Sequence, residues 1–261
     1  MDFEGFLRAV CSPLDLAWRR YRRRSARRRV LARMRELGIP DFRGYARRVL
    51  EDPAEAASLP DRMRVTVSRF LRERERWEIL FETALPELRR RAGGVLRAWS
   101  AGCCGGEEPY TLALLWRERG WPAEELEVLA TDLDRACLER ARKGVYGAGS
   151  LREVPPDLRS RWFRPGPGGW EVLPEVRQAV RFALHNLRDA PPAREMDLVL
   201  CRYLVFTYYR GRRRLEAARR LWEALKPGGA LVIGRKEGLG PAEQALFAPW
   251  PGAPGVYRKE G

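Results

Sequence analysis

The stretch WSAGCCGGEEPYTLALLW, from Trp99 to Trp116, joins a short apolar run to a glycine-rich turn and then to a second apolar run. A turn of this kind between a strand and a helix usually holds a phosphate, because free backbone N–H groups attract anions. Here Glu107 and Glu108 follow the turn directly and would repel an anion. The turn therefore binds either a cationic ligand or no ligand.

Strand-like and helix-like patterns alternate around this stretch. EEPYTLALLWRERG has helical character, with Pro109 in the first turn, where proline is tolerated. The predicted strands are 95–100, 126–132, 196–202 and 230–235. Strands that alternate with helices predict an α/β fold with a mostly parallel sheet and helices on both faces. Residues 150–182 break this rhythm with a turn flanked by short strands, which predicts a small antiparallel β insertion.

Residues 1–85 contain only helical patterns. Apolar positions from Leu14 to Leu37 share one helical face, which predicts a single long helix, and Asp41 is placed to cap the next one. The predicted breaks between helices are Gly38-Ile39-Pro40, Asp52-Pro53 and Leu59-Pro60-Asp61. These patterns predict an all-α N-terminal domain over residues 1–85 and an α/β domain over residues 86–261.

Composition limits the class of protein. With 261 residues and 45% hydrophobic residues, the chain is long and apolar enough to form a globular core. No apolar run reaches the roughly 18 residues of a membrane span, and the N-terminus lacks a secretory signal pattern. The five cysteines include no CxxC pair, so neither a disulfide framework nor a metal site is predicted. We expect a reducing, cytoplasmic location.

The chain is strongly basic, with a net charge of +15 and a pI near 10.3. Residues 1–50 hold fourteen arginines and only five acidic residues. They form either a solvated helix face or a docking surface for an acidic partner, protein or nucleic acid, with Arg28, Arg29 and Arg33 as candidates. A single asparagine, 19 prolines and many charges predict a thermophilic source, which would explain part of the basicity.

Polar residues and glycines collect where the predicted strands end, which is where open α/β sheets bind ligands. Ala101-Gly102 follows the first strand, and Asp132 ends the second. Asn186 and Cys201-Arg202-Tyr203 follow later strands. The acid suits the paired hydroxyls of a ribose, but the glycines do not form the nicotinamide fingerprint. A positively charged, phosphate-free nucleoside such as S-adenosylmethionine fits best, although each feature alone also fits a tight turn or a local cap.

The same residues resemble the chemotaxis receptor glutamate methyltransferases, the CheR family. WSAGCCGGEEPYTLALL is similar to the family signature WSAGCSxGEEPYSLA, and VTVSRFLRE (65–73) resembles NETxFFRE. Later blocks follow in the same order, namely ATDLDRACLERARKGVY, VRFALHNL, MDLVLCRYLVFTYY and LKPGGALVIGRKEGL. The resemblance covers nearly the whole chain. It implies a Rossmann-like class I methyltransferase domain over residues 86–261, preceded by a basic helical domain.

The resemblance also implies roles for individual residues. Ser68 and Arg72 would hold the methionine end of S-adenosylmethionine, and Thr66, which stands where the family pattern has an asparagine, is a further cofactor-binding candidate. Glu107 would face the positive charge of the cofactor, and Asp132 would bind its ribose. The other implied cofactor-binding residues are Ala101, Gly102, Asn186, Leu187, Tyr203 and Leu204. The implied catalytic residues are Arg72, Thr207 and Tyr208.

Two departures from the family pattern bear on the chemistry. The family's CRNVxIYF reads CRYLVFTYY here, so that Tyr203 replaces an asparagine and Thr207 stands at the expected active-site tyrosine. The resemblance implies methyl transfer to glutamate carboxylates on the cytoplasmic helices of chemoreceptors, with S-adenosylhomocysteine as product. No stable nucleic-acid complex and no membrane insertion are expected. The departures leave two alternatives, a divergent methyltransferase with another acceptor and a non-catalytic cofactor-binding signalling module.

Overall fold

The computed structural model describes residues 1–64 and 66–260, and the chain forms two compact units. The helical unit consists of residues 1–65 and 204–216. The sheet unit consists of residues 66–203 and 217–261. The sheet unit therefore includes residues 66–85, which the sequence patterns group with the N-terminal helices. The apolar side chains of Trp77 and Phe81 explain this grouping, because they belong to the core of the sheet unit.

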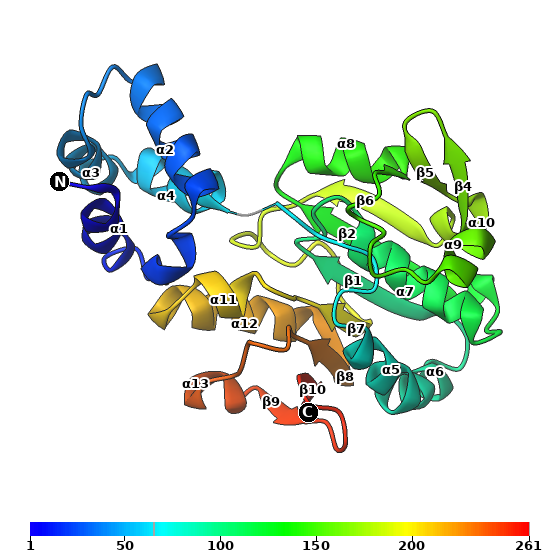
Figure 1. The fold of residues 1–261 in the computed structure, drawn as a ribbon. Coiled ribbons are helices and arrows are strands. Elements are labelled where there is room, and N and C mark those ends of the chain that lie inside the picture. Colours follow the sequence, from blue (N-terminus) through cyan, green and yellow to red (C-terminus); the bar gives the residue numbers. More distant parts are fainter. Residues whose placement is uncertain (65, 261) are drawn as a thin grey trace. The chain divides into compact units, whose positions relative to one another are not determined.

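The helical unit is built from short helices (Figure 1). Its helices are α1 (Phe3–Cys11), η1 (Trp18–Tyr21), α2 (Arg24–Glu36), α3 (Phe42–Glu51), α4 (Pro53–Met63) and α11 (Val205–Tyr208). Asp2, Asp41 and Asp52 each accept backbone N–H bonds at the start of a helix, as N-cap residues do. The Asp41 cap predicted from sequence is thereby confirmed.

Two predictions about the helical unit are wrong. Leu14 to Leu37 do not form a single helix, because the chain turns between α1 and α2. Asp15 has a left-handed backbone conformation with φ of 53°, and its carbonyl oxygen accepts a bond from the Arg210 backbone N–H at 2.7 Å. Pro60 does not end a helix either, since it lies inside α4. Burial of Leu59 and Pro60 shows that packing outweighs the hydrogen bond that proline removes.

The sheet unit contains a seven-stranded sheet with the order β6-β2-β1-β7-β8-β10-β9. The strands are β1 (Leu96–Ala101), β2 (Leu126–Asp132), β6 (Val180–Leu184), β7 (Met196–Leu200), β8 (Leu225–Val232), β9 (Phe247–Pro249) and β10 (Val256–Lys259). The strands from β6 to β8 pair in parallel, and β10 pairs antiparallel with both β8 and β9. The strand order reverses beside β1, which is the switch point where such sheets bind ligands.

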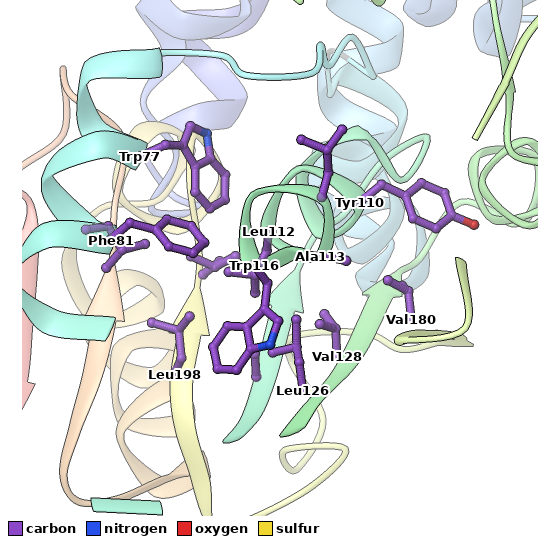
Figure 2. Close-up of a cluster of buried hydrophobic side chains, with 14 of the residues drawn as sticks. Trp77, Phe81, Tyr110, Leu112, Ala113, Trp116, Leu126, Val128, Val180 and Leu198 are labelled. Carbon is purple, nitrogen blue, oxygen red and sulfur yellow. The ribbon is translucent and has the colours of Figure 1, made fainter. Parts of the chain in front are cut away.

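Helices cover this sheet, as the sequence predicts. The helices of the sheet unit are α5 (Arg74–Glu82), α6 (Ala84–Ala92), α7 (Glu107–Glu118), η2 (Ala123–Glu125), α8 (Arg135–Lys143), α9 (Pro156–Trp162), α10 (Pro174–Arg177), α12 (Gly211–Ala224, from Ala217 onward) and α13 (Pro241–Gln244). Every residue of β7 is buried, which requires cover on both faces of the sheet. Figure 2 shows part of the core, to which Trp77 and Phe81 of α5, Trp116 of α7 and Leu198 of β7 all contribute.

A small three-stranded antiparallel sheet confirms the predicted β insertion. Its strands are β3 (Val145–Tyr146), β4 (Phe163–Gly166) and β5 (Gly169–Val172), in the order β3-β5-β4. The insertion begins before residue 150, and Val180 to Phe182 belong to β6 of the main sheet instead. The Phe70 ring lies edge-on to Tyr146 and to Phe163, which attaches the segment before α5 to this insertion.

Across the part of the chain that the structure describes, no helix combines the length and apolarity that crossing a membrane requires.

Candidate functional site

The glycine turn lies at the carboxyl ends of β1 and β2. The backbone N–H groups of Gly102 and Cys103 both donate to the Thr131 carbonyl oxygen, at 2.8 and 2.9 Å. Gly106 has φ of +89°, in the left-handed region that favours glycine, and a Cβ there would lie 2.9 Å from the Ala141 Cβ. The turn is thus fixed by β2 on one side and by α8 on the other.

Asp132 is buried at the end of β2, with 4% of its surface exposed. One carboxylate oxygen accepts the Cys104 N–H at 2.9 Å, and the other accepts the Asp134 N–H at 2.9 Å. Asp132 therefore orders the glycine turn and the start of α8.

Glu107, the first residue of α7, is 2% exposed. Its Oε1 accepts a hydrogen bond from Ser150 Oγ at 3.2 Å, whereas its Oε2 is buried and has no hydrogen-bond partner among the described residues. Burial raises the pKa of this carboxyl. A buried carboxylate oxygen without a partner is costly, so the site fits a ligand that brings positive charge.

Glu108 is held by protein groups. Its Oε1 accepts from Ser100 Oγ at 2.8 Å, and its Oε2 lies 3.5 Å from the Arg202 guanidinium. Burial raises the pKa of Glu108 as well, against the lowering effect of Arg202. Arg202 is only 5% exposed and also bonds Glu73 at 2.9 Å. This buried ion network places Glu108 in the framework that supports the site.

Arg72 and Tyr203 lie together in the sheet unit. The Arg72 guanidinium carbon is 3.8 Å from the centroid of the Tyr203 ring, a cation–π stack. The Tyr203 hydroxyl donates to Glu73, and its backbone N–H donates to Glu237 Oε2 at 2.8 Å. Burial, followed by the bond to Glu73, raises the pKa of Tyr203 to about 12. The residue that replaces the family's asparagine thus contacts the predicted Arg72.

The segment that carries Thr66 and Ser68 is fixed close to Glu107. Both side chains are half-buried, in a stretch without regular secondary structure. Beyond them, the Phe70 N–H donates to the Ser150 carbonyl at 3.0 Å, and the Leu71 N–H donates to Thr111 Oγ1 at 3.1 Å. Since Thr111 lies on α7 and Ser150 bonds Glu107, this segment meets the first turns of α7.

Asn186 and Leu187 follow the end of β6, beside Asp132. The backbone N–H of His185 donates to the Asp132 carbonyl at 3.1 Å, which continues the pairing of β6 with β2. Asn186 Oδ1 accepts from the Arg188 backbone N–H at 3.1 Å, and Leu187 is buried. The strand ends therefore bring Ala101, Gly102, Asp132, Asn186 and Leu187 to one edge of the sheet, as the sequence predicts.

Leu204, Thr207 and Tyr208 belong to the helical unit. Thr207 and Tyr208 lie on α11, and Leu204 directly precedes it. The buried Tyr208 ring packs 5.0 Å from the ring of Tyr21, between centroids. The cofactor role of Leu204 and the catalytic roles of Thr207 and Tyr208 stay predictions.

Sequence patterns did not single out Glu73, Ser150 or Glu237. Glu73 and Arg202 are 129 positions apart in the chain, and the sequence does not reveal which of its many arginines is buried. The one sequence feature that could have indicated Glu73 is its position directly after Arg72 in RFLRE.

Two family models match the chain over almost its whole length. The all-alpha domain of CheR methyltransferase matches residues 1–63, and the SAM binding domain of CheR methyltransferase matches residues 66–253. These ranges meet where the helical unit ends and the sheet unit begins.

Two of the similar proteins are named chemotaxis protein methyltransferases, and a third is named only as an uncharacterized protein. The chain is 32% identical over 246 residues to the chemotaxis protein methyltransferase of Listeria innocua, covering 94% of this chain and 93% of that protein. It is 31% identical to chemotaxis protein methyltransferase 2 of Vibrio cholerae, over 81% of this chain and 76% of that protein. An uncharacterized 104.1 kDa protein of Rhodobacter capsulatus is 35% identical over 84% of this chain, which spans only 23% of that protein's length.

Solved structures resemble the chain less closely. The N-methyltransferase NodS from Bradyrhizobium japonicum, solved with S-adenosyl-L-homocysteine, is 13% identical, with a TM-score of 0.42 over 72% of this chain and 87% of that chain. The assignment therefore depends on the sequence matches, which cover both units. By these matches the chain belongs to the CheR methyltransferase family, and the cofactor of its sheet unit is S-adenosylmethionine.

Proposed function

We propose that this protein transfers the methyl group of S-adenosylmethionine to glutamate side-chain carboxylates of chemoreceptor proteins. Support comes from the family match and from relatives named chemotaxis protein methyltransferases. The bound cofactor supplies a methyl group on a sulfonium, which an acceptor carboxylate takes up as a methyl ester, with S-adenosylhomocysteine as the other product.

The observation that carries the proposal is the buried Glu107 oxygen without a protein partner. A cationic ligand would offset the cost of burying this charge, and an anionic one would add to it. We assign Glu107 to the positive charge of the cofactor, Asp132 to the ribose hydroxyls, and Asn186 with Leu187 to the adenine. Ala101 and Gly102 supply the close backbone surface of the turn.

Arg72 is assigned to the carboxylate at the methionine end. A guanidinium offers a planar pair of N–H donors that matches a carboxylate. The Tyr203 ring, 3.8 Å from the guanidinium carbon, supports one face of this plane and leaves the N–H groups at its edge able to donate. Thr66 and Ser68 supply hydroxyl groups from the same segment, and Leu204 follows Tyr203 in the chain.

The proposed reaction does not depend on proton transfer by the protein. An ionised glutamate is already a nucleophile, so no strong general base is required. Rate enhancement would come from alignment of the acceptor oxygen and from exclusion of water. Arg72, Thr207 and Tyr208 are assigned to positioning the acceptor, in keeping with the resemblance.

The exposed arginines of α2 are assigned to docking the acidic acceptor. Two of the arginines suggested by the sequence have structural roles instead. Arg33 pairs with the buried Glu55 at 2.8 Å, and Arg29 donates to the Arg62 carbonyl at 3.4 Å, so both bind α2 to the segment of α4. The arginines that face solvent on α2 are Arg24, Arg27, Arg28 and Arg35. Such a surface suits an acidic helix electrostatically.

The test is methyl transfer from labelled S-adenosylmethionine to a purified cytoplasmic chemoreceptor fragment, followed by mild base. Methyl esters release methanol under base, and N-methyl groups do not. We expect base-labile label on the fragment. Tight binding of S-adenosylhomocysteine with no transfer to any fragment would support a non-catalytic module instead, and label on nucleic acid would support a different acceptor.

A further inference from the structure

Two cysteines meet at the glycine turn of the candidate site. Cys104 lies in the turn, and Cys137 lies in the first helical turn of α8. Their sulfur atoms are 3.9 Å apart, close to van der Waals contact, although the two residues are 33 positions apart in the chain. Both are free thiols.

The environment of the pair favours oxidation. The Arg140 guanidinium donates to the Cys104 sulfur at 3.5 Å, and a nearby cation stabilises a thiolate. The hydrogen bond from the Cys104 thiol lowers the pKa of Cys137, and the same pairing, together with burial, raises the pKa of Cys104. The lowered pKa makes Cys137 the thiolate of the pair, and it is 2% exposed. Cys104 is half-buried, so a small oxidant can approach the pair from its side, and the two sulfur atoms are close enough for one to resolve the other once it is oxidised.

Oxidation would act directly on the turn. Closing a disulfide shortens the sulfur separation from 3.9 Å to about 2.05 Å and imposes the bond's own dihedral geometry, so the two side chains must rotate and the turn or the start of α8 adjusts with them. The backbone N–H of Cys104 donates to Asp132 at 2.9 Å, and Asp134 caps α8 through the N–H groups of Ala136 and Cys137. A shift of Cys104 therefore disturbs the carboxylate assigned to the ribose.

We propose that Cys104 and Cys137 form a reversible disulfide that weakens cofactor binding, which makes the glycine turn an oxidation-sensitive modification site. With hydrogen peroxide, one sulfur is oxidised to a sulfenic acid and the other displaces water from it. The net change is two thiols and one peroxide giving one disulfide and two waters. By thermodynamic linkage, a bound cofactor must protect the pair from oxidation to the same degree. The effect on affinity depends on the proposed cofactor site.

The test uses the full chain, treated with peroxide or oxidised glutathione and digested without reduction. We expect a Cys104–Cys137 crosslink in peptide mapping, reversed by dithiothreitol and absent in Cys137→Ser. It should persist in Cys11→Ala, a matched control that removes a buried cysteine of the helical unit. Affinity for S-adenosylhomocysteine should fall about tenfold on oxidation, within the usual range of coupling between sites. In Cys137→Ser, oxidation should leave the affinity unchanged.

Three results would overturn the proposal: thiols that stay reduced under excess oxidant, a crosslink between Cys103 and Cys104, or a Cys104–Cys137 disulfide with unchanged affinity. A reduced protein that fails to bind S-adenosylhomocysteine would contradict the cofactor site itself. In that case peptide mapping would still show whether the Cys104–Cys137 disulfide forms, so the two failures are distinguishable.

Discussion

Glu107 and Glu108 are neighbours in the sequence, but their carboxylates have opposite surroundings. The Glu108 carboxylate contacts Ser100 Oγ at 2.8 Å and Arg202 at 3.5 Å. One oxygen of Glu107 accepts a hydrogen bond from Ser150 Oγ at 3.2 Å, and the other is buried without a partner among the described residues. One glutamate is held by the protein, and the other is available to a ligand.

Substitution of the two glutamates should therefore separate binding from folding. Glu107→Gln should weaken S-adenosylmethionine binding roughly 10- to 100-fold, the effect of losing a charged hydrogen-bond partner, without lowering the unfolding temperature of the ligand-free protein. Glu108→Gln is the matched control and should lower that temperature, because it leaves Arg202 without one of its anionic partners. Titration calorimetry measures the affinity for S-adenosylmethionine, and thermal unfolding measures the unfolding temperature. If both variants lost the same affinity and the same unfolding temperature, the two glutamates would not have the separate roles in binding and in folding.

The raised pKa of Glu107 gives a pH dependence with a definite sign. Its pKa in the folded protein lies above the ordinary 4.5, so the folded state holds the proton more tightly than the unfolded chain. The stability that Glu107 contributes is therefore present below pH 4.5 and is lost as pH rises through the raised value. The pKa of Glu108 is raised as well, so the contribution of Glu107 is isolated by comparing wild type with Glu107→Gln, which keeps Glu108.

Urea unfolding across this range should show the stability of the ligand-free wild type falling with pH relative to Glu107→Gln. Binding of S-adenosylmethionine should strengthen over the same range, because the ionised carboxylate is the form that attracts a cation. A wild type and variant with parallel stability profiles would show that burial does not perturb Glu107.

Arg72→Lys tests the stack on Tyr203. A lysine keeps the charge but loses both the planar pair of donors and the flat contact with the ring, so affinity for S-adenosylhomocysteine should fall about tenfold. Arg74→Lys is the matched control, since Arg74 is exposed and forms a surface ion pair with the exposed Glu78. The prediction fails if the two variants bind the ligand equally well.

Docking of an acidic acceptor through α2 predicts a selective defect. Charge reversal at Arg24, Arg27 and Arg28 should reduce methylation of a receptor fragment, and the defect should shrink as salt screens the wild-type attraction. S-adenosylhomocysteine affinity should stay within about twofold, because these residues are not among those assigned to the cofactor.

The matched control reverses three exposed arginines of the sheet unit, which changes net charge equally. These are Arg90, Arg97 and Arg181. If both triple variants lose the same activity, net charge and not the α2 surface governs docking. Competition with duplex DNA at constant ionic strength should leave transfer to the receptor fragment intact.

The sequence predicted those parts of the fold that depend on local patterns. The strand 126–132 coincides with β2, because an apolar run bounded by charged residues marks a buried strand. The predicted cap Asp41 accepts N–H bonds at the start of its helix. The edge of the sheet that gathers Gly102, Asp132 and Asn186 also follows from strand order, since parallel strands end at the same edge.

Structural features that depend on tertiary contacts were not predicted from the sequence. The break after α1 requires a left-handed Asp15 whose carbonyl bonds Arg210, a residue far along the chain. Pro60 remains helical because its surroundings are packed, which a local pattern does not reveal. The Glu73–Arg202 pair is similarly hidden, because exposed and buried arginines look alike in an arginine-rich sequence.

The central claim is that glutamate side chains of a chemoreceptor are the methyl acceptors. The most direct measurement is tandem mass spectrometry of a receptor cytoplasmic fragment after incubation with the protein and S-adenosylmethionine. The account predicts methyl groups on glutamate carboxylates, removed by mild base and absent when those glutamates are replaced by alanine. Methyl groups found only on nitrogen atoms of the fragment, or only on added nucleic acid, would contradict it.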